Sequence, residues 1–452
     1  MSFPTGFVWG AGTSAYQIEG GAGEHGRGES IWDSFCRAPG RIKHGDTGDV
    51  ACDHVARYRA DVALMKELGL GAYRFSISWP RVMPEGAGAP GEAGLAFYDA
   101  LVDELLGAGI TPYVTLFHWD YPLALYRRGG WMNPASPSWF AAYTKAVVDR
   151  LSDRVSNWIT LNEPQVFLAY GHLVGEHAPG LKLPLSEIMP MVHHALKAHG
   201  MAAACIRERA RTEPRIGWAP VGIASLPSAT APAEIEAARA KTFAVERADL
   251  WNNTLFDDPA ILGRYPEDSL ALLGRHLPPG WERDMDLIRQ PLDFLGLNFY
   301  QGSRVSLGPD GTAQPAPREI GRARTAFSWD ITPEVLYWGP RFFWERYGLP
   351  IVITENGMAN LDWIGLDGRV RDPQRIDYTA RHLQQLLRAV RDGVQVRGYF
   401  HWSLLDNFEW AEGYEQRFGL VYVDFHTQRR TPKDSARWYA EVIRTNGGSL
   451  PA

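Results

Sequence analysis

The sequence predicts an α/β protein in which residues 1–452 form one catalytic domain, a (β/α)8 TIM barrel. Short β-rich runs alternate with longer stretches of helical patterning along the chain. Eight such runs separated by helices are typical of a parallel sheet that closes into a barrel. The Pro- and Gly-rich patches at 84–94 and 306–317 are interpreted as surface loops, so no linker divides the chain.

The elements follow one another in the order that a barrel requires. The predicted strands are Phe7–Ala11, Ala72–Ser78, Pro112–Phe117, Trp158–Asn162, Arg215–Val221, Phe294–Phe299, Ile351–Glu355 and Val396–Trp402. The predicted helices between them are Ala56–Leu68, Ala93–Ala108, Trp139–Leu151, Met189–Arg209, Ala233–Trp251 and Arg375–Asp392.

The second predicted strand has two different faces. Side chains alternate along a strand, so Arg74 points to one side while Tyr73, Phe75 and Ile77 point to the other. The apolar set should face the helices, which leaves the arginine inside the barrel. A buried arginine needs an anion. Glu355 ends its own strand, and a contact between Arg74 and Glu355 is therefore predicted.

Two short phrases each end an apolar, strand-like run with one glutamate. They are Thr-Leu-Asn-Glu-Pro at 160–164, which contains Glu163, and Ile-Thr-Glu-Asn-Gly at 353–357, which contains Glu355. A carboxyl group at the end of a buried strand is costly unless it performs chemistry or has a partner. Either glutamate alone fits a helix cap or a salt bridge equally well. Two in matching contexts favour a converging pair.

Asn162 and Glu163 are neighbours, so strict alternation would point them apart. Pro164 is expected to hold Glu163 in an extended conformation and to end the strand there. Both side chains could then reach the mouth of the barrel.

Other polar and aromatic residues gather at the same strand ends. Barrel enzymes build their active sites at the carboxyl ends of the strands. The clustering therefore predicts an enzyme with its active site at that end. The residues are His118 and Trp119 after the third strand, Asn298 and Tyr300 at the end of the sixth, and His401 and Trp402 at the end of the eighth.

Composition excludes several other classes of protein. Hydrophobic residues make up 45% of the chain and charged residues 22%, and the net charge is −6, which favours neither nucleic-acid nor anionic-membrane binding. No segment has the length and apolarity of a membrane span or signal peptide, so a cytoplasmic location is expected. Aromatic residues reach 12%, including 17 tryptophans, and aromatic faces are suited to sugars. Most tryptophans are expected to fill the core.

No metal site or cofactor is predicted. Three widely spaced cysteines provide neither a disulfide framework nor a zinc motif, and they suit a reducing compartment: Cys36, Cys52 and Cys205. His193, His194 and His199 lie on one predicted helix without an accompanying carboxylate pattern.

From Phe3 to about Tyr439 the chain resembles family 1 glycoside hydrolases, the β-glucosidase and β-galactosidase group. The resemblance rests on the two glutamate phrases and on four further motifs, which occur in order and at spacings that a barrel allows. These motifs are Phe-Val-Trp-Gly-Ala-Gly-Thr-Ser-Ala-Tyr-Gln-Ile-Glu-Gly at 7–20, Tyr-Arg-Phe-Ser-Ile-Ser-Trp-Pro-Arg at 73–81, Trp-Ser-Leu-Leu-Asp-Asn-Phe-Glu-Trp at 402–410 and Arg-Phe-Gly-Leu at 417–420.

The resemblance implies a retaining mechanism, with carboxyl groups about 5–5.5 Å apart and a covalent glycosyl-enzyme. By motif, Glu355 is the nucleophile, supported by Arg74 and Tyr300, and Glu163 is the acid/base. The implied activity is a cofactor-free exo-β-glycosidase. Its substrates would be β-glycosides or oligosaccharides that end in β-D-glucosyl, and also β-D-galactosyl or β-D-fucosyl, residues.

The resemblance also implies a set of substrate-binding side chains. These are Gln17 and Glu409 for the 3-, 4- and 6-hydroxyls, His118 and Trp410 near the 3-hydroxyl, with Trp119 beside them, Asn162 for the 2-hydroxyl, Trp402 as the stacking floor and Trp329 as a platform for the leaving group. Glu409 would repel a 6-phosphate, and a glutamate at 163 differs from the glutamine of plant thioglucosidases. Gln165 and Ser328 depart from the family's usual aromatic residue and glycine, which affects the expected leaving group and not the chemistry.

Two rival functions stay open at this point. A transglycosylase would use the same glycosyl-enzyme with a sugar or alcohol as the acceptor. A non-catalytic glycan-binding protein would use the same scaffold, although such relatives typically lose one of the two carboxylates, and both are present here.

Overall fold

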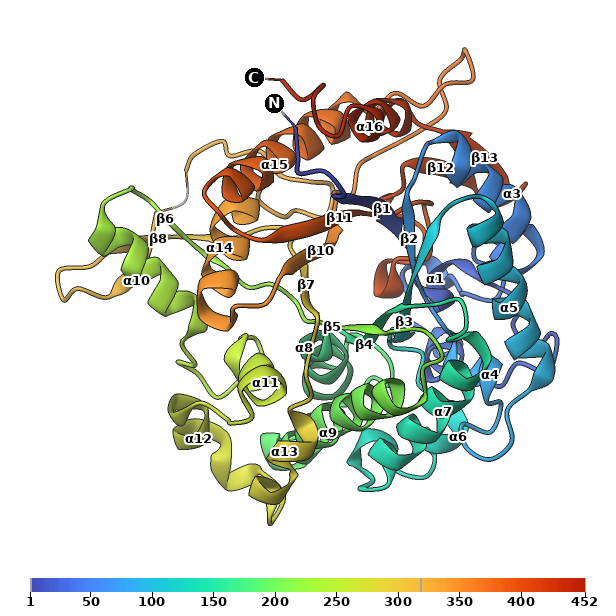
Figure 1. Cartoon of the computed structure of the whole chain (residues 1–452), viewed down its shortest axis with the longest axis horizontal. Coiled ribbons are helices and arrows are strands. Elements are labelled where there is room, and N and C mark those ends of the chain that lie inside the picture. The colour runs from blue at the N-terminus through green and yellow to red at the C-terminus, as the bar shows by residue number, and fades with distance from the viewer. Residues whose placement is uncertain (1, 318, 452) are drawn as a thin grey trace.

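Eight parallel strands close into a barrel at the centre of the computed structural model, which describes residues 2–317 and 319–451 (Figure 1). The order around the barrel is β1-β11-β10-β7-β5-β4-β3-β2. This arrangement confirms the predicted (β/α)8 fold. The strands are β1 (Val8–Gly12), β2 (Ala72–Ser76), β3 (Thr111–Phe117), β4 (Asn157–Asn162), β5 (Arg215–Ala219), β7 (Phe294–Asn298), β10 (Ile351–Asn356) and β11 (Val396–Trp402).

Helices connect successive strands and surround the barrel (Figure 1). The longer ones are α3 (His54–Glu67), α5 (Glu92–Gly107), α7 (Ser136–Leu151), α9 (Leu185–Arg209), α10 (Pro232–Phe243), α14 (Val335–Tyr347), α15 (Pro373–Arg391) and α16 (Asp434–Arg444). Within the described ranges, none of these helices has the length and apolar character that crossing a bilayer requires.

Shorter elements fill the connections. The short α-helices are α1 (Ala15–Ile18), α2 (Ile31–Cys36), α4 (Trp79–Val82), α6 (Leu123–Tyr126), α8 (Pro164–Leu168), α11 (Thr254–Asp257), α12 (Glu267–Leu273) and α13 (Met285–Ile288). The 3-10 helices are Lys43–Gly45, Gly130–Met132, Gly274–His276, Trp281–Asp284 and Trp410–Glu412, and the π-helices are Ala169–Val174 and Asp258–Leu262. Two small sheets are formed by β6 (Ser225–Pro227) with β8 (Ser303–Leu307) and β9 (Ala313–Pro315), and by β12 (Val421–Asp424) with β13 (Arg429–Pro432).

The predicted helix Ala233–Trp251 is wrong in its second half, because α10 ends at Phe243. Side chains from beyond the helix bond its last carbonyls: Asn253 Nδ2 donates to Thr242 O at 2.7 Å, and Thr254 Oγ1 donates to Phe243 O at 3.0 Å. These tertiary hydrogen bonds replace the next helical turn. The chain then runs irregularly from 244 to 253.

Apolar side chains fill the part of the barrel interior that lies away from the carboxyl ends of the strands. One residue from each strand contributes: Val8, Ala72, Tyr113, Ile159, Ala219, Phe294, Val352 and Phe400. We call these eight residues the apolar plug. The rings of Tyr113 and Phe400 lie 4.9 Å apart at 61°. Gly217 is required beside the plug, because a Cβ there would lie 2.2 Å from the Phe294 ring.

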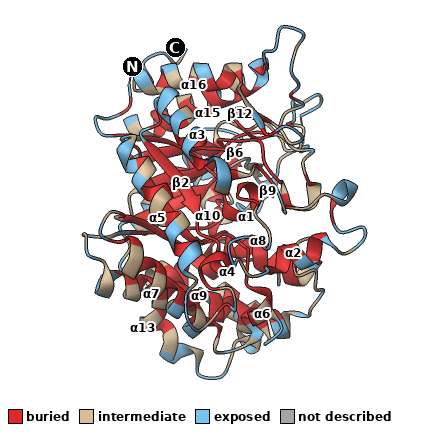
Figure 2. Ribbon diagram, turned by 90° about the vertical axis from the view of Figure 1, so that its right-hand side faces the viewer, coloured by how far each residue is buried: buried red, intermediate tan, exposed pale blue. Residues whose placement is uncertain are grey.

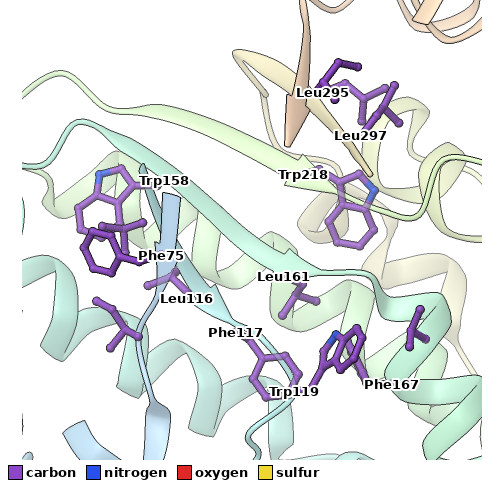
Figure 3. Packing of buried hydrophobic residues seen from close by; sticks show 14 of the residues in the cluster. Phe75, Leu116, Phe117, Trp119, Trp158, Leu161, Phe167, Trp218, Leu295 and Leu297 are labelled. Carbon is purple, nitrogen blue, oxygen red and sulfur yellow. The ribbon is translucent and has the colours of Figure 1, made fainter. Parts of the chain in front are cut away.

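The outer faces of the strands pack against the helices in a much larger apolar cluster, part of which is shown in Figure 3. Trp158 and Trp218 are fully buried in it. Tyr73, Phe75 and Ile77 belong to this cluster, as the alternation along β2 predicts. Buried residues occupy the centre of the molecule and exposed ones its periphery (Figure 2).

The apolar plug makes a direct prediction about stability. We expect Phe400→Ala to lower the free energy of unfolding by about 3–5 kcal/mol, because the side chain is fully buried and a cavity would remain in the barrel. Leu366→Ala is a control at a fully exposed position and should change it by less than about 0.5 kcal/mol. Urea denaturation followed by circular dichroism measures both. Equal, small effects would contradict the packing described for the plug.

Candidate active site

The guanidinium of Arg74 joins four strands above the apolar plug. Its side chain is 1% exposed. Nη1 donates to Glu355 Oε1 at 2.6 Å and to Thr354 O at 3.1 Å, Nη2 donates to Asn162 Oδ1 at 2.6 Å, and Nε donates to Thr115 Oγ1 at 3.2 Å. The arginine therefore fixes the positions of β2, β3, β4 and β10 relative to one another. The structure contains the predicted contact with Glu355. Strict alternation would place Glu355 on the same face as Ile351 and Ile353, which pack in the outer apolar cluster, but a register shift after Ile353 lets the Glu355 side chain face the barrel interior.

Both carboxylate oxygens of Glu355 are bonded. Arg74 binds Oε1, and the hydroxyl of Tyr300 donates to Oε2 at 2.6 Å. The glycine two residues after Glu355 allows β10 to approach β11 closely. A Cβ on Gly357 would lie 1.8 Å from the carbonyl oxygen of Trp402. The carboxylate is thus held in one orientation from two sides.

Glu163 adopts a left-handed conformation, with φ 47° and ψ 65°. The prediction that Pro164 would keep Glu163 extended is therefore wrong. A left-handed residue turns the chain sharply, which lets the side chains of the neighbours Asn162 and Glu163 reach the same space. Hydrogen bonds hold the turn, since Glu163 N donates to Ala219 O at 2.8 Å and Val166 N donates to Glu163 O at 2.9 Å. Pro164 instead begins helix α8, a position that suits proline.

Asn298 connects the two glutamate phrases. Its Nδ2 donates to Glu163 Oε1 at 2.8 Å and to Asn162 Oδ1 at 3.0 Å. Its Oδ1 accepts from Thr354 Oγ1 at 2.6 Å, which fixes the orientation of the amide. One side chain at the end of β7 therefore links the residue before Glu355 to Glu163.

His118 and Trp119, which directly follow β3, support Asn162. His118 Nε2 lies 3.1 Å from Asn162 Nδ2, and Trp119 Nε1 donates to the Asn162 carbonyl at 3.0 Å. Burial, and then the charge of Arg74, holds the pKa of His118 well below its usual value. The imidazole is therefore neutral near pH 7.

The two carboxyl groups have different electrostatic surroundings. Burial, followed by the charge of Glu355, raises the pKa of Glu163 to about 8. Burial also raises the pKa of Glu355, but the Arg74 cation and the Tyr300 hydrogen bond oppose that rise. Near neutral pH the negative charge is favoured on Glu355 and the proton on Glu163.

A third buried carboxyl group, Glu409, lies beside Gln17. Gln17 Nε2 donates to Glu409 Oε2 at 3.3 Å, and Asn407 Oδ1 and Phe408 O hold the same nitrogen at 3.0 and 2.9 Å. Burial, and then the charge of Glu355, raises the pKa of Glu409 to about 8. Gln17 and Glu409 thus present fixed polar groups close to Glu355.

Aromatic rings line the space between these polar groups. The His118 ring stacks on Trp402, with centroids 5.7 Å apart at 15°, and on Trp410, at 5.9 Å and 18°. Trp119 lies 4.4 Å from Trp410. Trp329 lies 5.1 Å from Tyr300, and both belong to the same apolar cluster as Trp402.

The structure brings together the residues that the sequence singles out, with one exception. His401 does not face the site: its ring packs against Tyr399 and against Tyr439 of α16. Sequence reasoning missed Thr115, Thr354 and Asn407, which hold the polar residues in place. The same alternation that puts Arg74 inside would have found the two threonines.

Comparisons with known proteins agree with this geometry. The model of glycosyl hydrolase family 1 matches residues 1–448. The chain is 45% identical to beta-glucosidase A of Thermotoga maritima over 98% of both chains, and 41% identical to a bifunctional beta-D-glucosidase/beta-D-fucosidase of Bifidobacterium breve over 98% of both. The structure of the Thermotoga maritima beta-glucosidase in complex with glucoimidazole superposes with a TM-score of 0.90 and covers 99% of each chain at 45% identity. The chain belongs to glycosyl hydrolase family 1.

The raised pKa of Glu163 predicts how stability depends on pH. The folded protein holds a proton that the unfolded chain releases near pH 4.5, so stability falls as the pH rises from about 4.5 to about 8. In Glu163→Gln there is no carboxyl group to ionise, so this pH-dependent change in stability is absent. We expect the variant to match the wild type at low pH and to be more stable above pH 8, as measured by urea midpoints across this range.

Glu187→Gln is the matched control, because Glu187 is exposed on α9, and its stability curve should run parallel to that of the wild type. A curve for Glu163→Gln that also runs parallel to the wild type would show that Glu163 ionises normally.

Proposed function

We propose that this protein is a retaining, exo-acting β-glucosidase that removes terminal β-D-glucosyl residues, and also β-D-fucosyl and β-D-galactosyl residues. The observation that carries the proposal is the pair of buried carboxyl groups with different surroundings. Arg74 and Tyr300 bind Glu355, whereas Asn298 donates to Glu163 without supplying a cation. One group is suited to attack and the other to carry a proton.

In the first half-reaction a Glu355 oxygen attacks the anomeric carbon from below the sugar ring. The bond between that carbon and the glycosidic oxygen breaks, and Glu163 gives its proton to the departing oxygen. The products are an alcohol and a glycosyl ester of Glu355. The hydrogen bonds to both oxygens of Glu355 fix the attacking orientation.

In the second half-reaction Glu163 removes a proton from water, and the resulting hydroxide attacks the anomeric carbon. The ester bond breaks, and Glu355 leaves as a carboxylate. Once Glu355 is esterified its negative charge is gone, so the charge that raises the pKa of Glu163 is removed. Glu163 then becomes a better base at the step where a base is needed.

The remaining polar groups are assigned to the sugar. Asn162, which accepts from Arg74 and Asn298, would bind the 2-hydroxyl. Gln17 and Glu409 would bind hydroxyls at the far side of the ring. These assignments and those of the aromatic residues follow from the family motifs together with the contacts described above. They are His118, Trp119 and Trp410 near the 3-hydroxyl, Trp402 as the stacking floor and Trp329 toward the leaving group.

Packing behind Gln17 supports exo action. The ring of its neighbour Tyr16 lies 6.1 Å from Trp32 and 5.7 Å from Phe408, and all three are buried. In the proposal, this buried apolar layer closes the sugar site behind Gln17. A terminal sugar is therefore the proposed substrate unit, and a small β-glycoside or oligosaccharide the proposed partner.

The named relatives support the choice of sugar. They include beta-glucosidases and a bifunctional beta-D-glucosidase/beta-D-fucosidase, whose two sugars differ in the configuration at C4 and in the presence of the 6-hydroxyl. The solved relatives include complexes with glucoimidazole and castanospermine. We also place the enzyme in the cytoplasm, since Cys36 and Cys52 are buried and unpaired; a fractionation that recovers it outside the cell would contradict this.

Substitution of each glutamate tests the proposed roles. We expect Glu355→Gln to lower kcat by on the order of 10⁶-fold for every β-glucoside, because the nucleophile is lost. Glu163→Gln should lower kcat/KM by about 10²–10⁴-fold for alkyl and sugar leaving groups but far less for activated aryl groups, which depart without a proton. A panel of chromogenic and natural β-glucosides measures these values.

Equal losses across leaving groups in Glu163→Gln would remove the acid/base role. Proton NMR of the first-formed sugar provides a second check. Initial release of the α-anomer would overturn the retaining mechanism.

The pKa values also predict the pH profile of the reaction. Glu163 must be protonated in the first half-reaction, and its pKa is about 8, so kcat/KM for an alkyl β-glucoside should fall above about pH 8. On the acid side kcat/KM should fall as Glu355 takes up a proton. In Glu163→Gln the alkaline decline should disappear for an activated aryl glucoside. An unchanged alkaline limb in that variant would assign it to another group.

A further inference from the structure

A network of buried charged side chains holds the segment 402–410, which carries Trp402, Glu409 and Trp410. Three carboxylates and three cations take part, and all but Arg417 have fully buried side chains. They come from the connections after β10 and β11, from the start of α15 and from the residue directly before α16. We call them the buried ion network: Asp362, Asp372, Arg375, Asp406, Arg417 and Lys433.

Lys433 joins the two halves of the buried ion network. Its Nζ donates to Asp406 Oδ1 at 2.7 Å and to Asp362 Oδ2 at 2.6 Å. Arg375 Nη2 also donates to Asp362 Oδ2 at 2.7 Å, and Arg417 Nη1 donates to Asp406 Oδ2 at 2.7 Å. The ammonium group therefore bridges one carboxylate on the connection after β10 and another on the connection after β11.

Asp406 transmits this anchorage to the segment 402–410. Its Oδ1 also accepts from Gly419 N at 2.9 Å, and its backbone N–H donates to Val421 O at 2.9 Å. A Cβ on Gly419 would lie 2.1 Å from Asp406 N, so the two backbone segments touch directly. Asp406 is thus fixed through both its side chain and its backbone.

The residues that follow Asp406 carry its position to the candidate sugar site. Asn407 Oδ1 accepts from Gln17 Nε2 at 3.0 Å, and Phe408 N donates to Gln17 O at 3.2 Å. Glu409 comes next and accepts from the same Gln17 nitrogen at 3.3 Å. A displacement of Asp406 would therefore disturb Gln17 and Glu409 together, and shifts of about 1 Å are enough to weaken substrate recognition.

The charge of Lys433 has a role that packing alone would not fulfil. A fully buried ammonium group is costly and must be met by anions. Burial, followed by the charge of Arg375, lowers the pKa of Lys433, while Asp406 and Asp362 oppose that change. Apolar side chains of the same volume would fill this space at lower cost, but they would not fix the direction of the Asp406 carboxylate.

We propose that Lys433 is a positioning residue for recognition of the 4-hydroxyl of the terminal sugar, acting through Asp406 on Gln17 and Glu409. The proposal rests on the proposed β-glucosidase function and on the assignment of the 3-, 4- and 6-hydroxyls to Gln17 and Glu409. Lys433 acts from outside the sugar site, and a helix on the outer side of the barrel thereby contributes to sugar specificity.

Two substrates with the same leaving group test the proposal: 4-nitrophenyl β-D-glucoside and 4-nitrophenyl 4-deoxy-β-D-glucoside. The ratio of kcat/KM for the first to that for the second measures the contribution of the 4-hydroxyl. We expect Lys433→Met and Asp406→Asn each to lower this ratio by about 3- to 10-fold, because the hydroxyl no longer meets its partners in the right geometry. In both variants kcat for the 4-deoxyglucoside should change by less than about twofold, since the carboxyl pair stays in place.

Arg346→Met is the matched control, because it breaks a different ion pair in the same way. Arg346 lies on α14, outside the sugar site, and its Nη2 donates to the buried Asp258 Oδ2 at 2.7 Å. The substitution should lower stability and leave the ratio unchanged. Thermal denaturation of each variant measures the loss of stability and verifies that the protein is folded.

An unchanged ratio in folded Lys433→Met and Asp406→Asn would overturn the proposal. An equal fall in Arg346→Met would attribute the effect to lost stability and overturn it as well. If Lys433→Met does not fold, Asp406→Asn decides, since its amide keeps the size and shape of the carboxylate. A wild type that cleaves both substrates with equal kcat/KM would overturn the proposal and leave the β-glucosidase function standing, whereas inactivity on both would remove that function.

Discussion

The active site depends on one buried cation. Arg74 lies inside the barrel, where a guanidinium without an anion would be strongly destabilising. Glu355 supplies that anion, and the other donors of Arg74 bind Asn162, Thr115 and the Thr354 carbonyl. The need to satisfy this cation therefore fixes a negative charge at the end of β10 and, at the same time, the geometry of three neighbouring strands.

The difference between the two glutamates follows from that charge. Glu355 is adjacent to the cation, and Glu163 is not bonded to it but feels the charge of Glu355. The hydrogen bond from Asn298 holds the Glu163 carboxyl group at the site without supplying a positive charge. Two residues of the same type are thus distinguished by what lies around them, as the family's chemistry requires.

The sequence predicts most of the barrel because strand alternation and helical periodicity are local signals. The errors occur where distant residues decide the conformation. Asn253 and Thr254 end α10 by donating hydrogen bonds to its last carbonyls, and no local sequence pattern predicts these bonds. Glu163 turns left-handed because Ala219, on another strand, holds its backbone N–H.

The motifs that carry the resemblance locate the candidate site, whereas the residues that hold its side chains in place are harder to recognise in the sequence. Thr115 and Thr354 belong to ordinary strand sequences, and only their inward register gives them a role. His401 shows the converse. It stands next to Trp402 in the same phrase, yet it points to the helices because neighbouring residues on a strand face opposite sides.

Among residues 2–317 and 319–451, the apolar plug closes the barrel on the side of Arg74 away from the carboxyl ends of the strands. Side chains from all eight strands fill the barrel below Arg74, so neither water nor product can pass through to the other end. The two products must leave by the same opening in a fixed sequence, the detached group first and the released monosaccharide last. Free monosaccharide that re-enters this opening competes with incoming substrate, and a second sugar that enters early competes with water for the glycosyl-enzyme. The balance between hydrolysis and transglycosylation is therefore set by whether water or a second sugar, entering through the same opening, reaches the glycosyl-enzyme.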